Sequence, residues 1–148
     1  MTDAYPVTIT FDVNWGDMDA FGHVNNARYF TWFESCRTAY FVRLGLRMDR
    51  PSSLGPIVAR LTCDYIAPVT YPANLTCGVR VVKIGNTSFT MAYALWPTGK
   101  PEQLHARGES VVVLLDYVTN HKVRVPDDMR RAIEEIEHPS HPSHTKTP

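Results

Sequence analysis

The sequence has few cysteines, no excess of charge of either sign and no long apolar run. Its three cysteines, Cys36, Cys63 and Cys77, are an odd number without CxxC spacing, and the amino-terminal stretch does not combine basic residues with an apolar run, so we expect a cytoplasmic rather than a secreted protein. No apolar run approaches the ~20 residues of a membrane span. Fifteen basic residues balance fifteen acidic ones, which argues against nucleic-acid or membrane partners.

The chain does have many apolar and aromatic residues that can form a hydrophobic core. Of its 148 residues, 44% are apolar and 11% aromatic, which is typical of one compact domain. We assign this domain to residues 1–137. Residues 138–148 hold no core formers and predict a disordered tail, in which His138, His141 and His144 are interpreted as incidental rather than as metal ligands.

One strand and one long helix are predicted in the first third of the chain. Val7–Val13 alternates and is rich in β-branched residues, which indicates a strand. A turn-rich stretch follows, in which Asn25 or Asn26 is the expected helix N-cap. Helical spacing then runs from Ala27 to Leu44, with Gly45 as the C-cap. The helix should bury one arc, formed by Tyr29, Phe33, Cys36, Tyr40 and Leu44.

The rest of the chain predicts a sheet. After a connection over Arg50–Pro56, four further strands are expected, with a hairpin turn at Gly85–Asn86 and a short helix beginning near Pro126. This order indicates an α+β domain with a five-stranded antiparallel sheet around one long helix, and the open sheet edges predict a homodimer or a dimer of dimers. The four strands are Ile57–Ile66, Leu75–Ile84, Ser88–Trp96 and Gln103–Tyr117.

The chemistry is expected where the first strand meets the helix. Asp19 stands six residues before Asn25, and a helix N-terminus offers unpaired N–H groups that can hold negative charge on an oxygen. A carboxylate beside such donors suits acyl transfer. The alternative is that Asp17 and Asp19 only satisfy backbone groups of the turn.

The run WGDMDAFGHVNNARYFTWFE resembles the signature of the hotdog-fold acyl-CoA thioesterases, the 4-hydroxybenzoyl-CoA thioesterase-like superfamily, and especially its branch with HVNNARY. The later CDYIAPVTYPANL and KIGNTSF are also similar to that family, so the resemblance covers Val7–Tyr117. It implies a sheet wrapped around a helix, protomers joined edge to edge, and two active sites at the dimer interface.

The resemblance also implies site residues. The catalytic carboxylate, acting as base or nucleophile, falls on Asp19, and the backbone N–H that polarises the thioester carbonyl falls at Asn26. A side-chain role at this point would go to the Asn26 amide, to Asn25 or to His23. Glu34 on the helix is the reserve candidate for the catalytic carboxylate, because other hotdog branches use a helix carboxylate. Substrate contacts are expected from Asn25 and from the turn residues Asn86, Thr87 and Ser88.

The expected reaction is hydrolysis of an acyl-CoA, or of an acyl-carrier-protein thioester, to the free acid. Coenzyme A is then part of the substrate, and no separate cofactor is expected. No metal is expected either, because Asp17, Asp19 and His23 lack a fourth ligand at suitable spacing. Two alternatives stay open: an acyl-thioester dehydratase of the same fold, and a non-catalytic acyl-CoA-binding module.

Overall fold

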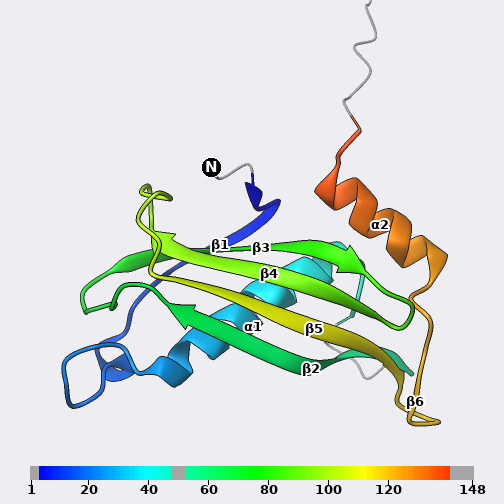
Figure 1. Cartoon of the computed structure of the whole chain (residues 1–148), viewed down its shortest axis with the longest axis horizontal. Coiled ribbons are helices and arrows are strands. Elements are labelled where there is room, and N and C mark those ends of the chain that lie inside the picture. The colour runs from blue at the N-terminus through cyan, green and yellow to red at the C-terminus, as the bar shows by residue number, and fades with distance from the viewer. Residues whose placement is uncertain (1–3, 48–52, 141–148) are drawn as a thin grey trace, which may run out of the picture.

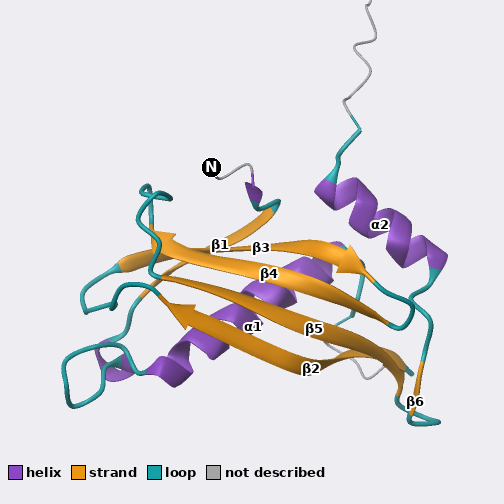
Figure 2. Ribbon diagram, in the orientation of Figure 1, coloured by secondary structure: helices purple, strands orange, loops and turns teal. Residues whose placement is uncertain are grey.

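The computed structural model describes residues 4–47 and 53–140. One antiparallel sheet has the strand order β1-β3-β4-β5-β2, and the two-residue strand β6 pairs with β5. Figures 1 and 2 show this sheet curved around α1, with α2 beside the end of β3. The predicted five strands and long helix are confirmed, and β6 is an addition. The elements are β1 (Val7–Asp12), the 3-10 turn η2 (Trp15–Asp17), α1 (Asn26–Arg43), β2 (Leu54–Tyr65), β3 (Asn74–Ile84), β4 (Ser88–Pro97), β5 (Ala106–Asp116), β6 (His121–Lys122) and α2 (Asp127–Glu137).

Helix α1 begins and ends at the expected signals. The side chain of Asn25, the N-cap, accepts a hydrogen bond from the N–H of Ala27 at 2.9 Å, and Gly45 takes the left-handed conformation just past the end. The buried face is broader than the predicted arc, because it includes Trp32 and the inward-turned Arg37, which donates to the Tyr93 hydroxyl at 3.2 Å. The buried residues of α1 are Tyr29, Trp32, Phe33, Cys36, Arg37, Tyr40 and Phe41.

The middle of α1 lies close to the sheet because β5 has a glycine there. The ring of Phe33 stacks on Tyr93, with centroids 4.8 Å apart, and it also covers Gly108. A Cβ at Gly108 would lie 2.8 Å from the main-chain oxygen of Thr62 and would overlap the Phe33 ring. The contact between helix and sheet therefore depends on the missing side chain.

We expect Gly108→Ala to lower the free energy of unfolding by about 1 to 3 kcal/mol, because the helix or the neighbouring strand must move to admit a methyl group. Gly16→Ala is the matched control, since a Cβ there meets nothing within 4 Å. Denaturant unfolding of both variants measures the difference. Equal midpoints for the two variants would contradict this account of the packing.

Strand β2 forms one edge of the sheet and starts earlier than predicted. Its first residues pair with the end of β5, so Leu54–Pro56 is strand and not connection. Pro56 lies opposite Leu114, whose N–H and carbonyl bond to Thr87 and Val123 and therefore point away from β2. In an antiparallel pair of this kind the nitrogen and carbonyl of Pro56 also point away from β5, toward the free edge, so the missing N–H costs no hydrogen bond within the sheet. The Tyr117 hydroxyl donates to that carbonyl at 2.7 Å.

The short helix α2 covers the part of β3 that extends beyond β1. β1 pairs with β3 only as far as Val79. Past this point the N–H of Val81 donates to Oε1 of Glu137 at 2.7 Å, and the hydroxyl of Tyr40 donates to the same oxygen at 3.3 Å. Burial raises the pKa of the Glu137 carboxyl. α2 ends at Glu137, and most of the expected disordered tail, residues 141–148, lies outside the described residues.

Strand β5 begins at Ala106 rather than at Gln103, because the N–H of Gln103 closes a turn onto Lys100. No helix within residues 4–47 and 53–140 is long and apolar enough to cross a bilayer.

Candidate active site

Asp17 holds the connection between β1 and α1 together. Its side chain is buried, and Oδ2 accepts the N–H of Asn14 at 2.8 Å. Oδ1 lies 3.4 Å from Nε of Arg28, and the main-chain oxygen accepts the N–H of Asn25 at 2.9 Å. These contacts connect η2 to the first turn of α1, so Asp17 satisfies groups of the turn, as the alternative interpretation of Asp17 and Asp19 expects.

Asp19 lies further out, on an exposed turn. Its N–H donates to the main-chain oxygen of His23 at 2.8 Å, and its main-chain oxygen accepts the N–H of Gly22 at 3.1 Å. Oδ1 accepts the N–H of Phe21 at 2.8 Å, whereas Oδ2 has no hydrogen-bond partner in the described part of the chain. Asp19 thus satisfies the turn with one oxygen and keeps the other available for chemistry.

The start of α1 has one backbone N–H without an acceptor in the part of the chain that the structure describes. The N–H of Asn25 is bound by Asp17, that of Ala27 by the Asn25 side chain, and that of Arg28 by the main-chain oxygen of Asn25. The N–H of Asn26 has no acceptor among the described residues. It is also at the positive end of the helix dipole, where a developing oxyanion is stabilised.

A cavity of about 270 Å³ opens beside this donor. Two of the predicted site residues, His23 and Asn26, line this cavity, whereas Asp19 and Asn25 do not. Its walls are mainly apolar and aromatic, which suits an acyl or pantetheine chain. The lining residues are His23, Val24, Asn26, Tyr29, Tyr65, Ile66, Ala67 and Pro68.

Sequence reasoning did not single out Tyr65. Its hydroxyl donates to the main-chain oxygen of Asn26 at 2.9 Å, and burial is the main cause that raises its pKa to about 12. Burial also raises the pKa of the nearby Cys63 thiol, which disfavours the thiolate form that a nucleophile needs. The Tyr65–Asn26 bond joins residues 39 apart, so no local pattern could have indicated it.

The predicted turn residues lie at the opposite end of the protomer. Tyr65 pairs with Ala106 at the start of β5, whereas Ser88 pairs with Val113 near its end, and Figure 1 shows the turn between β3 and β4 far from the loop that precedes α1. The turn is held by α2, because Nη2 of Arg130 donates to the main-chain oxygen of Gly85 at 2.8 Å. Asn86, Thr87 and Ser88 therefore cannot join Asp19 within one protomer.

The reserve carboxylate Glu34 is exposed on α1, two helical turns beyond Asn26. Like Asp19, it lines none of the described cavities, so the cavities do not distinguish the two carboxylates. The structure therefore gives no reason to prefer Glu34.

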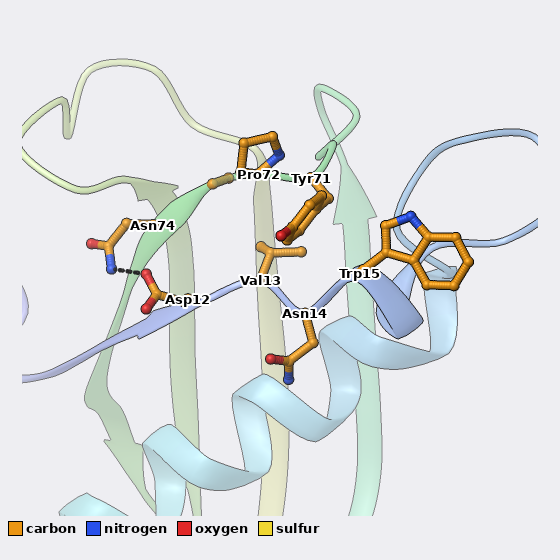
Figure 3. Close-up of a pocket in the computed structure, with 8 residues that line it drawn as sticks. Asp12, Val13, Asn14, Trp15, Tyr71, Pro72 and Asn74 are labelled. Carbon is orange, nitrogen blue, oxygen red and sulfur yellow. Dashed lines mark hydrogen bonds between the residues drawn. The ribbon is translucent and has the colours of Figure 1, made fainter.

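A second, larger cavity of about 540 Å³ lies where β1 ends (Figure 3). Nδ2 of Asn74 donates to Oδ1 of Asp12 at 2.8 Å on one side of it, and the exposed rings of Trp15 and Tyr71 lie on the other. None of the predicted site residues lines this cavity.

No group of three or more His, Cys, Asp or Glu side chains that could hold a metal ion occurs within residues 4–47 and 53–140. His141 and His144, two of the three tail histidines, lie outside these residues.

Comparisons with known proteins agree with this architecture. The model of the thioesterase-like superfamily matches residues 13–133. The uncharacterized protein YsmA of Bacillus subtilis is 32% identical over 81 residues, which cover 55% of this chain and 54% of YsmA, so the chain matches about half the length of this curated relative.

Two crystal structures match over nearly the whole chain. The PA5185 protein of Pseudomonas aeruginosa has a TM-score of 0.80 and 30% identity, covering 90% of this chain and 93% of that one. A thioesterase of Thermus thermophilus, crystallised with coenzyme A and zinc, has a TM-score of 0.79 and 30% identity, covering 90% and 96%. The chain belongs to the thioesterase-like superfamily and has the hotdog fold of its thioesterases.

Proposed function

We propose that the protein is a cytoplasmic thioesterase that hydrolyses an acyl-CoA to the free acid and coenzyme A. The observation that carries this proposal is the N–H of Asn26 at the start of α1, beside the loop that holds the Asp19 carboxylate. Among residues 4–47 and 53–140, neither this N–H nor Oδ2 of Asp19 has a hydrogen-bond partner. Membership of the superfamily supports thioester chemistry in general. The coenzyme A bound to the Thermus thermophilus thioesterase supports coenzyme A as the thiol part of the substrate.

In the proposed reaction the thioester carbonyl oxygen accepts the hydrogen bond from Asn26. As a general base, Asp19 takes a proton from water, the hydroxide adds to the carbonyl carbon, and the negative charge that develops on the oxygen is held by the Asn26 N–H and the helix dipole. The tetrahedral intermediate then expels the thiolate of coenzyme A. As a nucleophile, Asp19 would form an anhydride that water hydrolyses. His23, which lines the cavity beside Asn26, would orient the water.

The site is completed by a second copy of the chain. If two β2 edges pair antiparallel about a two-fold axis, the Leu54 end of one strand meets the Tyr65 end of the other. The β3–β4 turn lies at the Leu54 end of the sheet, since Ser88 and Ile57 both pair with Val113. The partner's turn would thus approach the cavity beside Asn26, where it can contact coenzyme A.

We expect a dimer or a dimer of dimers in solution. Light scattering at micromolar concentration measures the mass directly. A monomer of 16.8 kDa would exclude the composite site, because one protomer does not bring the turn and the loop together.

The direct test of the function is a panel of short, long and aromatic acyl-CoAs, with the released thiol trapped by a chromogenic reagent. We expect turnover with at least one of them. Tight binding of acyl-CoA without release of thiol would instead indicate a binding module.

A further inference from the structure

The first turn of α1 is attached to the end of β2 by one side chain. The hydroxyl of Tyr65, the last residue of β2, donates to the main-chain oxygen of Asn26 at 2.9 Å. We propose that Tyr65 is a positioning residue, which fixes this turn so that the N–H of Asn26 is aimed at the substrate carbonyl. The inference rests on the function proposed above.

The N–H of Asn26 has no acceptor of its own, among the described residues, to hold it in one direction, so its direction depends on the bonds around it. The carbonyl of the same peptide unit, that of Asn25, accepts the N–H of Arg28 at 3.0 Å. The next peptide unit is held at both of its polar groups, because the Asn25 side chain accepts the N–H of Ala27 at 2.9 Å and Tyr65 donates to the carbonyl of Asn26. Helix ends fray when such bonds are missing, and a displaced donor stabilises an oxyanion less well because its distance and angle to that oxygen change.

Tyr65 is itself well anchored. Its backbone pairs with Ala106 on β5, and its ring packs edge-on against the buried ring of Tyr29, with centroids 4.8 Å apart at an angle of 81°. The hydrogen bond from the Tyr65 hydroxyl therefore fixes the first turn of α1 relative to the sheet. Because the pKa of Tyr65 is raised to about 12, the phenol remains protonated, and so a hydrogen-bond donor, throughout the neutral range.

The test is Tyr65→Phe, which keeps the ring and removes only the O–H. We expect kcat to fall about tenfold and KM to stay within about twofold, since the loss affects the transition state more than binding. The loss in kcat should be the same at every pH between about 6 and 9, because the substitution removes no group that titrates in this range. Tyr71→Phe is the matched control, since the Tyr71 hydroxyl is on an exposed loop outside this cavity, and it should behave as the parent.

Amide hydrogen exchange gives a readout that does not depend on turnover. In Tyr65→Phe the amides of the first turn of α1 should exchange faster, while those in the middle of the helix keep their rates and the melting temperature changes little. Unchanged exchange in the first turn would overturn the proposal, and so would a parental kcat. A pH-dependent loss would overturn it as well, because it would make Tyr65 a proton donor. If the parent hydrolyses no acyl-CoA, the proposed function fails, and the exchange result still decides whether Tyr65 fixes the turn.

Discussion

Replacing Asp19 by asparagine is expected to lower kcat by about 10²- to 10⁴-fold, or about 3 to 5 kcal/mol in the barrier, with KM within about threefold. The amide keeps the shape of the carboxylate, and its oxygen can still accept the N–H of Phe21, which now bonds Oδ1 at 2.8 Å. It cannot act as an anionic base or nucleophile. An effect confined to turnover would therefore separate the chemistry from the folding of the loop. Steady-state kinetics on the best substrate of the panel measures it.

Asp17→Asn is the matched control two residues away. Asp17 is buried, with its oxygens on Asn14 and Arg28, so its replacement should lower the melting temperature more than it lowers kcat at a temperature where the variant is folded. Turnover within about threefold of the parent in Asp19→Asn, together with its loss in Glu34→Gln, would move the catalytic carboxylate to the helix.

Replacing Asn26 by proline should lower kcat by about 10²- to 10³-fold, the usual loss for one oxyanion donor. Asn26 is the first residue of α1, the position at which helices accept proline most readily because its N–H makes no bond within the helix. Asn25 already has φ −60° and ψ 135°, the extended conformation that a residue before proline prefers. The carbonyl that Tyr65 binds is retained. The substitution thus removes the backbone donor together with the Asn26 side chain, and it leaves the rest of the helix start in place.

Asn26→Ala separates the main chain from the side chain, because it removes the amide and keeps the N–H. We expect kcat within about threefold of the parent for Asn26→Ala, and equal melting temperatures for both variants. A folded Asn26→Pro protein with parental turnover would show that the oxyanion is held elsewhere. An equal loss in both variants would assign the role to the Asn26 side chain.

The elements that could be predicted from the sequence are those whose signals are local. Asn25 and Gly45 mark the ends of α1, and Gly85–Asn86 marks the turn of the meander, because caps and turns depend on the residues that form them. The loop with Asp19, His23 and Asn26 could be located for the same reason, since these residues follow one another in the chain. Assignment to the HVNNARY branch and the catalytic roles stay predictions.

What the sequence did not indicate depends on contacts between distant segments. Pro56 suggests a break in a strand, yet it is part of β2, because only the pairing with Leu114 shows that its nitrogen faces the free edge. Arginine is usually found on the surface, yet the Arg37 side chain points into the core, where it donates a hydrogen bond to the hydroxyl of Tyr93. Tyr65 reaches Asn26 because β2 ends beside α1. None of these relations is contained in a local pattern.

The proline at the start of β2 also limits how the protein can associate. At Pro56 the free edge has no N–H to donate, and its carbonyl is already occupied by Tyr117. A ladder between two copies must therefore stop short of this residue, and a slipped pairing that placed Pro56 inside the ladder would lose hydrogen bonds. In the dimer proposed above, the interface would therefore have a fixed length and alignment, which would disfavour both filament growth along this edge and misaligned dimers whose half-sites do not meet.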